Sequence, residues 1–295
     1  MYDVLFHIGD IAYNLHERKG HQGHDFMNKI EPISSIIPYM TCPGNHESFG
    51  NFSHYDARFS MLGNFNKTEH LVPLKDRLNN HYYSFNLGPA HIIMFSSEFY
   101  FYPKYYGIHH FQKQFAWLEN DLKIANHNRK DYPWIIAMAH RPLYCFNCEN
   151  LEHKELRLGP SIDGVHNSGL ENLFFKYGVD LQFYGHQHHY ARTLPVHNKI
   201  LKNHSGEGNH FHDSQGPIHY ITGSGGCREK HTKFNQNLSH VKFLGFYRED
   251  YGYTRMTFLD PFKIKLEQTS IDHEGKVIDT IQVSKSHPEP AWMRK

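Results

Sequence analysis

Four short apolar runs in this sequence each stop abruptly at glycine or polar residues. The runs, each with the residues that end it, are 4–8 (Gly-Asp at 9–10), 134–139 (His140), 179–184 (Gly-His at 185–186) and 218–222 (Gly-Ser-Gly-Gly at 223–226). Short apolar runs bounded in this way are typical of buried β-strands. Because functional side chains gather at the carboxyl ends of strands in α/β sheets, we expect the four polar ends to meet at one rim.

The remaining sequence alternates between strand and helix patterns. A hairpin is expected on either side of the Gly-Pro turn at 88–89, and helices are expected between the strands. The expected segments are strands at 82–86 and 91–96, helices at 25–37, 109–126 and 169–177, and a strand-rich end at 253–283. This order predicts a layered α/β sandwich in one domain over residues 1–283. Residues 284–295, which include two prolines, are expected to form a frayed tail.

Four short segments, three of them at these strand ends, contain residue types that can bind metals. They are Gly-Asp-Ile-Ala-Tyr at 9–13, Gly-Asn-His-Glu at 44–47, Ala-His-Arg-Pro at 139–142 and Gly-His-Gln-His at 185–188. Carboxylate, amide and imidazole groups in these segments suit Zn, Fe or Mn. His186 and His188 are two residues apart, which on a strand places them on one face about 6–7 Å apart. Two cations roughly 3.5–4 Å apart could then each take one imidazole. The chain has 27 histidines, so position rather than abundance singles these out.

These motifs, in this order, resemble those of the calcineurin-like metallophosphoesterases. Tyr13 in the Gly-Asp-x-x-Tyr motif is the residue that distinguishes the purple acid phosphatases, in which a phenolate binds ferric iron and gives the colour. The chain is similar to the long animal iron/zinc purple acid phosphatase-like proteins over nearly its whole length. The resemblance implies an α/β/β/α metallophosphoesterase sandwich.

The resemblance also implies a set of metal ligands. Six residues match the family's positions: Asp10, Tyr13, Asn45, His140, His186 and His188. Asp10 would be the bridging carboxylate, and Tyr13 and His188 would bind Fe(III). The other three would bind a divalent cation, either Zn, Mn or Fe.

Two histidines are candidates for direct action on the substrate. By the resemblance, His46 would donate to a phosphate oxygen; the alternative is a histidine merely held by Glu47. In the family a further histidine, from the loop after the strand-end histidine, assists the leaving group as an acid. His153 is the nearby candidate, although the loop at 145–153 lacks the adjacent histidine pair typical of plant members.

The implied activity is that of an acid phosphatase, in which a hydroxide bound to two metals hydrolyses phosphate monoesters. The family's Gly-Asp-x-Gly segment, which supplies another carboxylate, does not occur before Asp10. We therefore expect a chain truncated at its N-terminus, lacking the first strand and helix, with impaired activity. The alternatives are an inactive, truncated metal-binding glycoprotein or a related metallophosphodiesterase, and Tyr13 argues against the second.

Composition limits the partners. The formal net charge is +1, so attraction to nucleic acid is not indicated, and no apolar run approaches the roughly 18 residues that span a membrane. Sequons for glycosylation at Asn51, Asn66, Asn203 and Asn237, together with the resemblance, predict a secreted or lysosomal glycoprotein, although no signal peptide opens the chain. Cys145 and Cys148 form a lone C-x-x-C, which indicates a disulfide or two free thiols rather than a zinc site.

Overall fold

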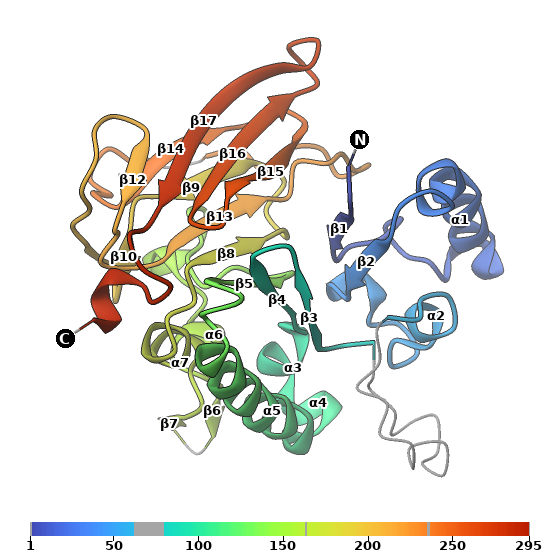
Figure 1. Cartoon of the computed structure of the whole chain (residues 1–295). Helices are drawn as coiled ribbons and strands as arrows, with labels where there is room; N and C mark the ends of the chain where they lie inside the picture. Colours follow the sequence, from blue (N-terminus) through green and yellow to red (C-terminus); the bar gives the residue numbers. More distant parts are fainter. Residues whose placement is uncertain (1, 62–79, 163, 235–236, 295) are drawn as a thin grey trace.

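The computed structural model describes residues 2–61, 80–162, 164–234 and 237–294. Within these residues the largest sheet has seven strands (Figure 1). Their spatial order is β14 (Leu244–Arg248), β9 (Tyr190–Thr193), β13 (Ile218–Thr222), β8 (Leu181–Tyr184), β5 (Trp134–Ala139), β4 (Ala90–Met94) and β3 (Tyr83–Leu87). The strands from β13 to β4 are parallel, and β9, β14 and β3 are antiparallel to their neighbours.

Burial explains why the central strands are mostly apolar. Every residue of β4, β5 and β8 is buried, as parallel strands covered on both faces require. The expected strands at 134–139 and 218–222 are found with those bounds, and the strand expected at 179–184 begins two residues later. The hairpin across Gly88 is formed by β3 and β4. The predicted α/β class is confirmed.

The first apolar run lies in a separate small sheet. In the described part of the chain, β1 (Leu5–Ile8) pairs in parallel only with β2 (Tyr39–Cys42), a strand that the sequence pattern did not predict. The connection between them contains η1 (Glu17–Gly20) and α1 (His21–Ser34). Helix α1 therefore begins four residues before the expected segment and ends three before its end. The carbonyl of Ile8 accepts a hydrogen bond from His140, which ties this unit to the large sheet.

The other helices include α5, α6 and α7, which lie together on one side of the large sheet (Figure 1). Their bounds are α2 (Ser53–Asp56), α3 (Glu98–Phe101), α4 (Pro103–Tyr106), α5 (Ile108–His127), α6 (Lys154–Arg157), α7 (Leu170–Lys176), η2 (Asn45–Glu47), η5 (Glu149–Leu151) and η6 (Ala291–Met293). Helix α5, expected at 109–126, buries Phe111, Leu118 and Leu122. Helix α7 covers all but the two end residues of the segment expected to be helical. No helix among the described residues combines the length and apolar character needed to cross a membrane.

The strand-rich end forms a second sheet. Its order in the described chain is β12 (His210–His212), β17 (Lys276–Ser284), β16 (Lys263–Ser270) and β15 (Gly252–Asp260), on the side of the large sheet away from α5–α7 (Figure 1). Two short hairpins, β6 (Ser161–Ile162) with β7 (Val165–His166) and β10 (Val196–His197) with β11 (Ile200–Leu201), complete the strands described.

The residues after β17 are not frayed, so that expectation is wrong. Lys285 is buried, and its ammonium group contacts the Asp180 carboxylate at 2.9 Å. The indole N–H of Trp292 donates to the carbonyl of Phe175 at 3.0 Å. Arg294 forms an ion pair with Asp213 at 2.7 Å. These contacts dock the segment although its composition is typical of a loose end.

Candidate metal centre

The ends of four strands meet, and three of them are the polar tips expected at 9–10, 140 and 185–186. Asp10 follows β1, Asn45 follows β2, His140 follows β5 and His186 follows β8. Glycine allows this close approach, because a Cβ atom at Gly44 would lie 2.8 Å from Cγ of His140. The fourth predicted tip is also present, since a Cβ at Gly223 would clash with the carbonyl of Gln187, next to His186.

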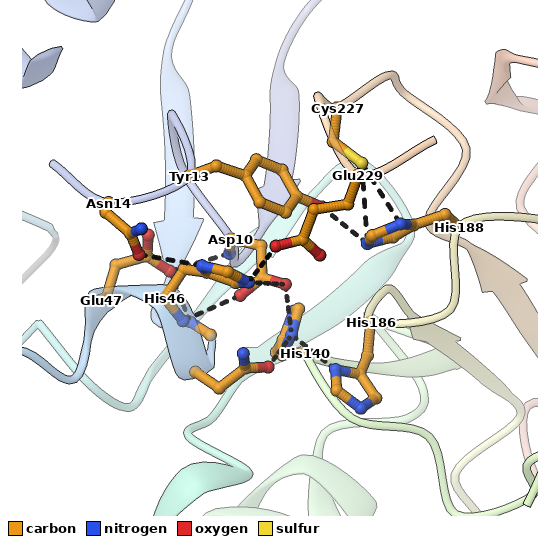
Figure 2. A network of polar contacts seen from close by, with 12 residues as sticks. Asp10, Tyr13, Asn14, His46, Glu47, His140, His186, His188, Cys227 and Glu229 are labelled. Atoms are coloured by element: carbon orange, nitrogen blue, oxygen red, sulfur yellow. Dashed lines mark hydrogen bonds and ion pairs between the residues drawn. The ribbon is translucent and has the colours of Figure 1, made fainter. Parts of the chain in front are cut away.

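Four donor atoms lie around one point, and we name their residues the Asp10 half: Asp10, Asn45, His140 and His186 (Figure 2). From Nε2 of His140, the distances are 3.1 Å to Oδ2 of Asp10, 3.1 Å to Oδ1 of Asn45 and 3.2 Å to Nδ1 of His186. Donors in a tetrahedron around a metal at about 2.1 Å are about 3.4 Å apart. The donor atoms of Asp10, His140 and His186 all lie within 4.8 Å of one another, so these three residues could hold a single cation, with Asn45 beside them.

Tyr13 and His188, which we name the Tyr13 half, lie beside it. The Tyr13 hydroxyl contacts Nε2 of His188 at 2.9 Å. Nδ1–H of His188 donates to the carbonyl of Lys230 at 2.9 Å, just as Nδ1–H of His140 donates to that of Ile8 at 3.0 Å. In both rings the lone pair of Nε2 therefore points into the site, which is the tautomer that a metal requires.

The charges of the site are coupled. Burial alone would raise the pKa of Asp10, but the neighbouring rings of His140 and His46 outweigh it and hold that pKa well below its usual range. Burial alone would lower the pKa of His140, but the Asp10 carboxylate raises it. Burial and then the charge of Asp10 raise the pKa of the Tyr13 hydroxyl. A cation bound here would displace the protons of His140 and Tyr13, so the affinity for the cation would decrease as the pH decreases.

Glu47 holds the turn that carries Asp10. It is buried, and its carboxylate accepts hydrogen bonds from the backbone N–H groups of Asp10, Ile11 and Gly44 at 2.7–2.8 Å. Burial and the nearby charge of Asp10 raise the pKa of Glu47 to about 8. Asp10 and Tyr13 have φ angles of 56° and 46°, left-handed conformations that cost about 1–2 kcal/mol each. Glu47 therefore stabilises this strained turn through its backbone N–H groups. The role of His46 stays a prediction.

His46 is oriented toward the site by other groups (Figure 2). Its backbone N–H donates to Oδ1 of Asp10 at 3.1 Å, and its Nδ1–H donates to Oδ1 of Asn14 at 2.9 Å. The Asn14 amide in turn donates to Glu17 at 2.7 Å. Nε2 of His46 lies 4.0 Å from Oδ2 of Asp10, so the ring stands next to the Asp10 half.

His153 lies behind the cluster. Its Nδ1–H donates to the carbonyl of Pro142 at 2.7 Å, and its Nε2 lies 3.1 Å from Sγ of Cys148. Burial lowers its pKa to about 4. Cys145 and Cys148 form a disulfide, which settles the alternative that the sequence left open. The role of His153 as an acid stays a prediction, and both ring nitrogens of His153 already have partners.

The predicted sequons are only partly described. Asn51, Asn203 and Asn237 are exposed, as a glycosylated asparagine must be. Asn66 lies outside the described residues. Glycosylation stays a prediction at all four.

Some residues of the site were not expected. Arg141 extends from the strand-end motif to Nε2 of His186 at 3.1 Å, and its guanidinium also contacts the buried Glu98 carboxylate at 2.9 Å. Cys227 and Glu229 approach from the loop after β13 (Figure 2). The Ala-His-Arg-Pro motif could have indicated Arg141, but nothing in the sequence marks the other two.

Two models of known protein families match the sequence. The family model for calcineurin-like phosphoesterases matches residues 1–190, and the model for the iron/zinc purple acid phosphatase-like protein C region matches residues 216–280. The chain belongs to the calcineurin-like phosphoesterase family, whose members have a dinuclear metal centre. Within that family, its C-terminal region is of the purple acid phosphatase kind.

Individual relatives fit the same branch. Acid phosphatase type 7 from Danio rerio is 45% identical over 99% of this chain, which spans 64% of that protein. Probable inactive purple acid phosphatase 1 from Arabidopsis thaliana is 29% identical, and this chain spans 44% of it. The structure of purple acid phosphatase PPD1 from yellow lupin superposes with a TM-score of 0.74 and 25% identity, over 97% of this chain and 47% of that one.

Proposed function

We propose that this chain is a metal-dependent acid phosphatase that hydrolyses phosphate monoesters. One observation carries the proposal: the Asp10 half gathers four donor atoms around one point, with the Tyr13 half alongside. The acid phosphatase named among its relatives supports the substrate class.

The donor atoms favour different cations in the two halves. Imidazole and amide donors dominate the Asp10 half, which suits Zn, Mn or Fe(II). Tyr13 offers a phenol that becomes an anionic oxygen donor, which favours trivalent iron. We infer Fe(III) in the Tyr13 half and a divalent cation in the Asp10 half, with the Asp10 carboxylate shared between them. When bound, the two cations would neutralise phosphate oxygens and make a coordinated water more acidic.

The protein's own groups would orient and protonate the substrate. His46 presents Nε2 to the site because Asn14 holds its other nitrogen. In the protonated form Nε2–H can donate to a phosphate oxygen or to the leaving group. Glu47 keeps the Asp10 turn in place while the charge on the phosphate changes.

A secreted or lysosomal location is part of the proposal. Exposed sequons at Asn51, Asn203 and Asn237 and the disulfide between Cys145 and Cys148 support it, because disulfides persist in oxidising compartments.

The second candidate is a metal-binding protein without phosphatase activity, which one relative's name favours. A phosphodiesterase is a third possibility, against which Tyr13 argues. Turnover of p-nitrophenyl phosphate and of bis(p-nitrophenyl) phosphate by the purified 295-residue chain at pH 5, with iron and zinc supplied, separates the three.

We expect monoester turnover that Asp10→Asn abolishes and that Asp131→Asn, a change at an exposed carboxylate, leaves intact. Preferred turnover of the diester would indicate the phosphodiesterase. Bound metal without turnover of either ester would indicate the inactive protein.

A further inference from the structure

The loop after β13 brings consecutive residues to the Tyr13 half. Sγ of Cys227 lies 3.2 Å from Nδ1 of His188. The carbonyl of Lys230 accepts the hydrogen bond from the same nitrogen at 2.9 Å, and the backbone N–H of Thr232 donates to the carbonyl of His188 at 3.2 Å. The loop is therefore held against His188 at more than one point.

An ion pair holds the other side of this loop. The Arg228 guanidinium contacts both carboxylate oxygens of Glu17, at 2.6 and 2.8 Å. Glu17 also accepts the hydrogen bond from Asn14, the residue that orients His46. Residue 229 lies between these two attachments, which keep its backbone close to the Tyr13 half.

Glu229 directs its carboxylate into the space between the two halves (Figure 2). Oε1 of Glu229 lies 3.6 Å from Nε2 of His46. His46 in turn lies 4.0 Å from Oδ2 of Asp10, the carboxylate that the two halves would share. The side chain is 47% exposed, so it can change rotamer without disturbing the core.

We propose that Glu229 is a further carboxylate ligand of the cation in the Tyr13 half, an inference that rests on the proposed function. Among the described residues, this half otherwise offers the phenol of Tyr13, the imidazole of His188 and the shared carboxylate of Asp10. A trivalent cation favours anionic oxygen donors. Glu229 supplies one from a loop that is already attached to His188.

The test is Fe(III) binding by Glu229→Gln in the 295-residue chain, measured by competition with a chelator, together with the tyrosinate-to-iron absorption band. We expect the affinity for Fe(III) to fall by roughly 10- to 100-fold, in the range seen when groups around a metal are lost. The band should move to lower energy, because a neutral amide leaves the iron more electron-poor. Zinc bound by the Asp10 half should be unchanged. Glu229→Asp should restore part of the affinity, and Glu207→Gln, an exposed control, should change nothing.

A second pair of variants excludes an effect through His46. If Glu229 acts only by its contact with His46, Glu229→Gln has no effect when His46→Gln is already present. We expect the same loss of affinity in both backgrounds. An unshifted band with unchanged affinity in Glu229→Gln overturns the ligand assignment alone. An unmodified chain that takes up no iron overturns the assignment together with the proposed metal centre.

Discussion

The two halves of the candidate centre are built in different ways. Asp10 and His140 are 7% and 1% exposed and follow buried strands, so the Asp10 half has its positions set by the core. Tyr13 follows Asp10 in the same left-handed turn, and its half also depends on the loop after β13, where Glu229 is about half exposed. A half set by strand ends can hold its donors ready without a cation. A half built by loops depends on contacts that bring distant segments together.

The largest expected effect is at His140, whose Nε2 contacts the three other residues of the Asp10 half. We expect His140→Ala to lose the divalent cation and to lower turnover by roughly 10³-fold, because several kcal/mol of charge stabilisation disappear. Metal analysis and the monoester assay check both effects. His127→Ala, an exposed histidine at the end of α5, is the control. One full equivalent of zinc in His140→Ala would contradict the assignment.

His46 tests whether a residue between the halves acts on substrate rather than on metal. We expect His46→Ala to lower turnover by roughly 10²-fold, the range of a lost acid or hydrogen-bond donor, with metal content unchanged. Asn14→Ala should have a smaller effect in the same direction, because it only orients the ring. Loss of metal from His46→Ala would show that the ring is a ligand or a structural support.

Tyr13→Phe sharpens the comparison by removing one half alone. We expect the tyrosinate absorption band to vanish and Fe(III) affinity to fall by at least roughly 10-fold, while the Asp10 half keeps its divalent cation. Absorption spectra and metal titrations measure the two halves separately. Tyr39→Phe is the control, because its hydroxyl contacts His7 and lies outside the site. If zinc is lost along with iron, the halves are not independent.

The smallest expected effect is on the stability of the fold that carries both halves, at acidic pH. His219 is buried, and neither of its ring nitrogens has a partner in the described part of the chain. Burial lowers its pKa to about 3, so the unfolded chain takes up the proton first. The contribution to stability is full above pH 6.5 and is lost as the pH falls toward 3, with about 2 kcal/mol lost at pH 5.

The measurement is urea unfolding of His219→Leu at pH 7.5 and pH 5. We expect this variant to lose less stability on acidification than the unmodified chain, by about 2 kcal/mol. His240→Leu, a change at an exposed histidine, should lose as much as the unmodified chain. Equal losses in all three chains would show that His219 does not limit stability in acid.

The sequence by itself determined the strand ends and the residues that occupy them. Apolar runs that end at glycine and polar residues are local patterns. The runs of β5 and β8 are easily recognised because these buried strands consist mainly of apolar residues. The order and spacing of the motifs likewise placed His140 and His186 among the predicted metal ligands. Helix α1 and strand β2 were harder, because Pro32 obscures the helix and β2 is only four residues long.

Only the tertiary structure decided which loop approaches the Tyr13 half and how residues 285–294 pack. Arg228 and Glu17 are 211 positions apart, and their ion pair fixes the loop that presents Glu229. The contacts of Lys285 with Asp180 and of Trp292 with Phe175 dock the last residues in the same way. Such contacts follow from packing between segments distant in sequence, and no local periodicity records them. The strands and helices could therefore be predicted from the amino-acid sequence, whereas the positions of the loops depend on the tertiary structure.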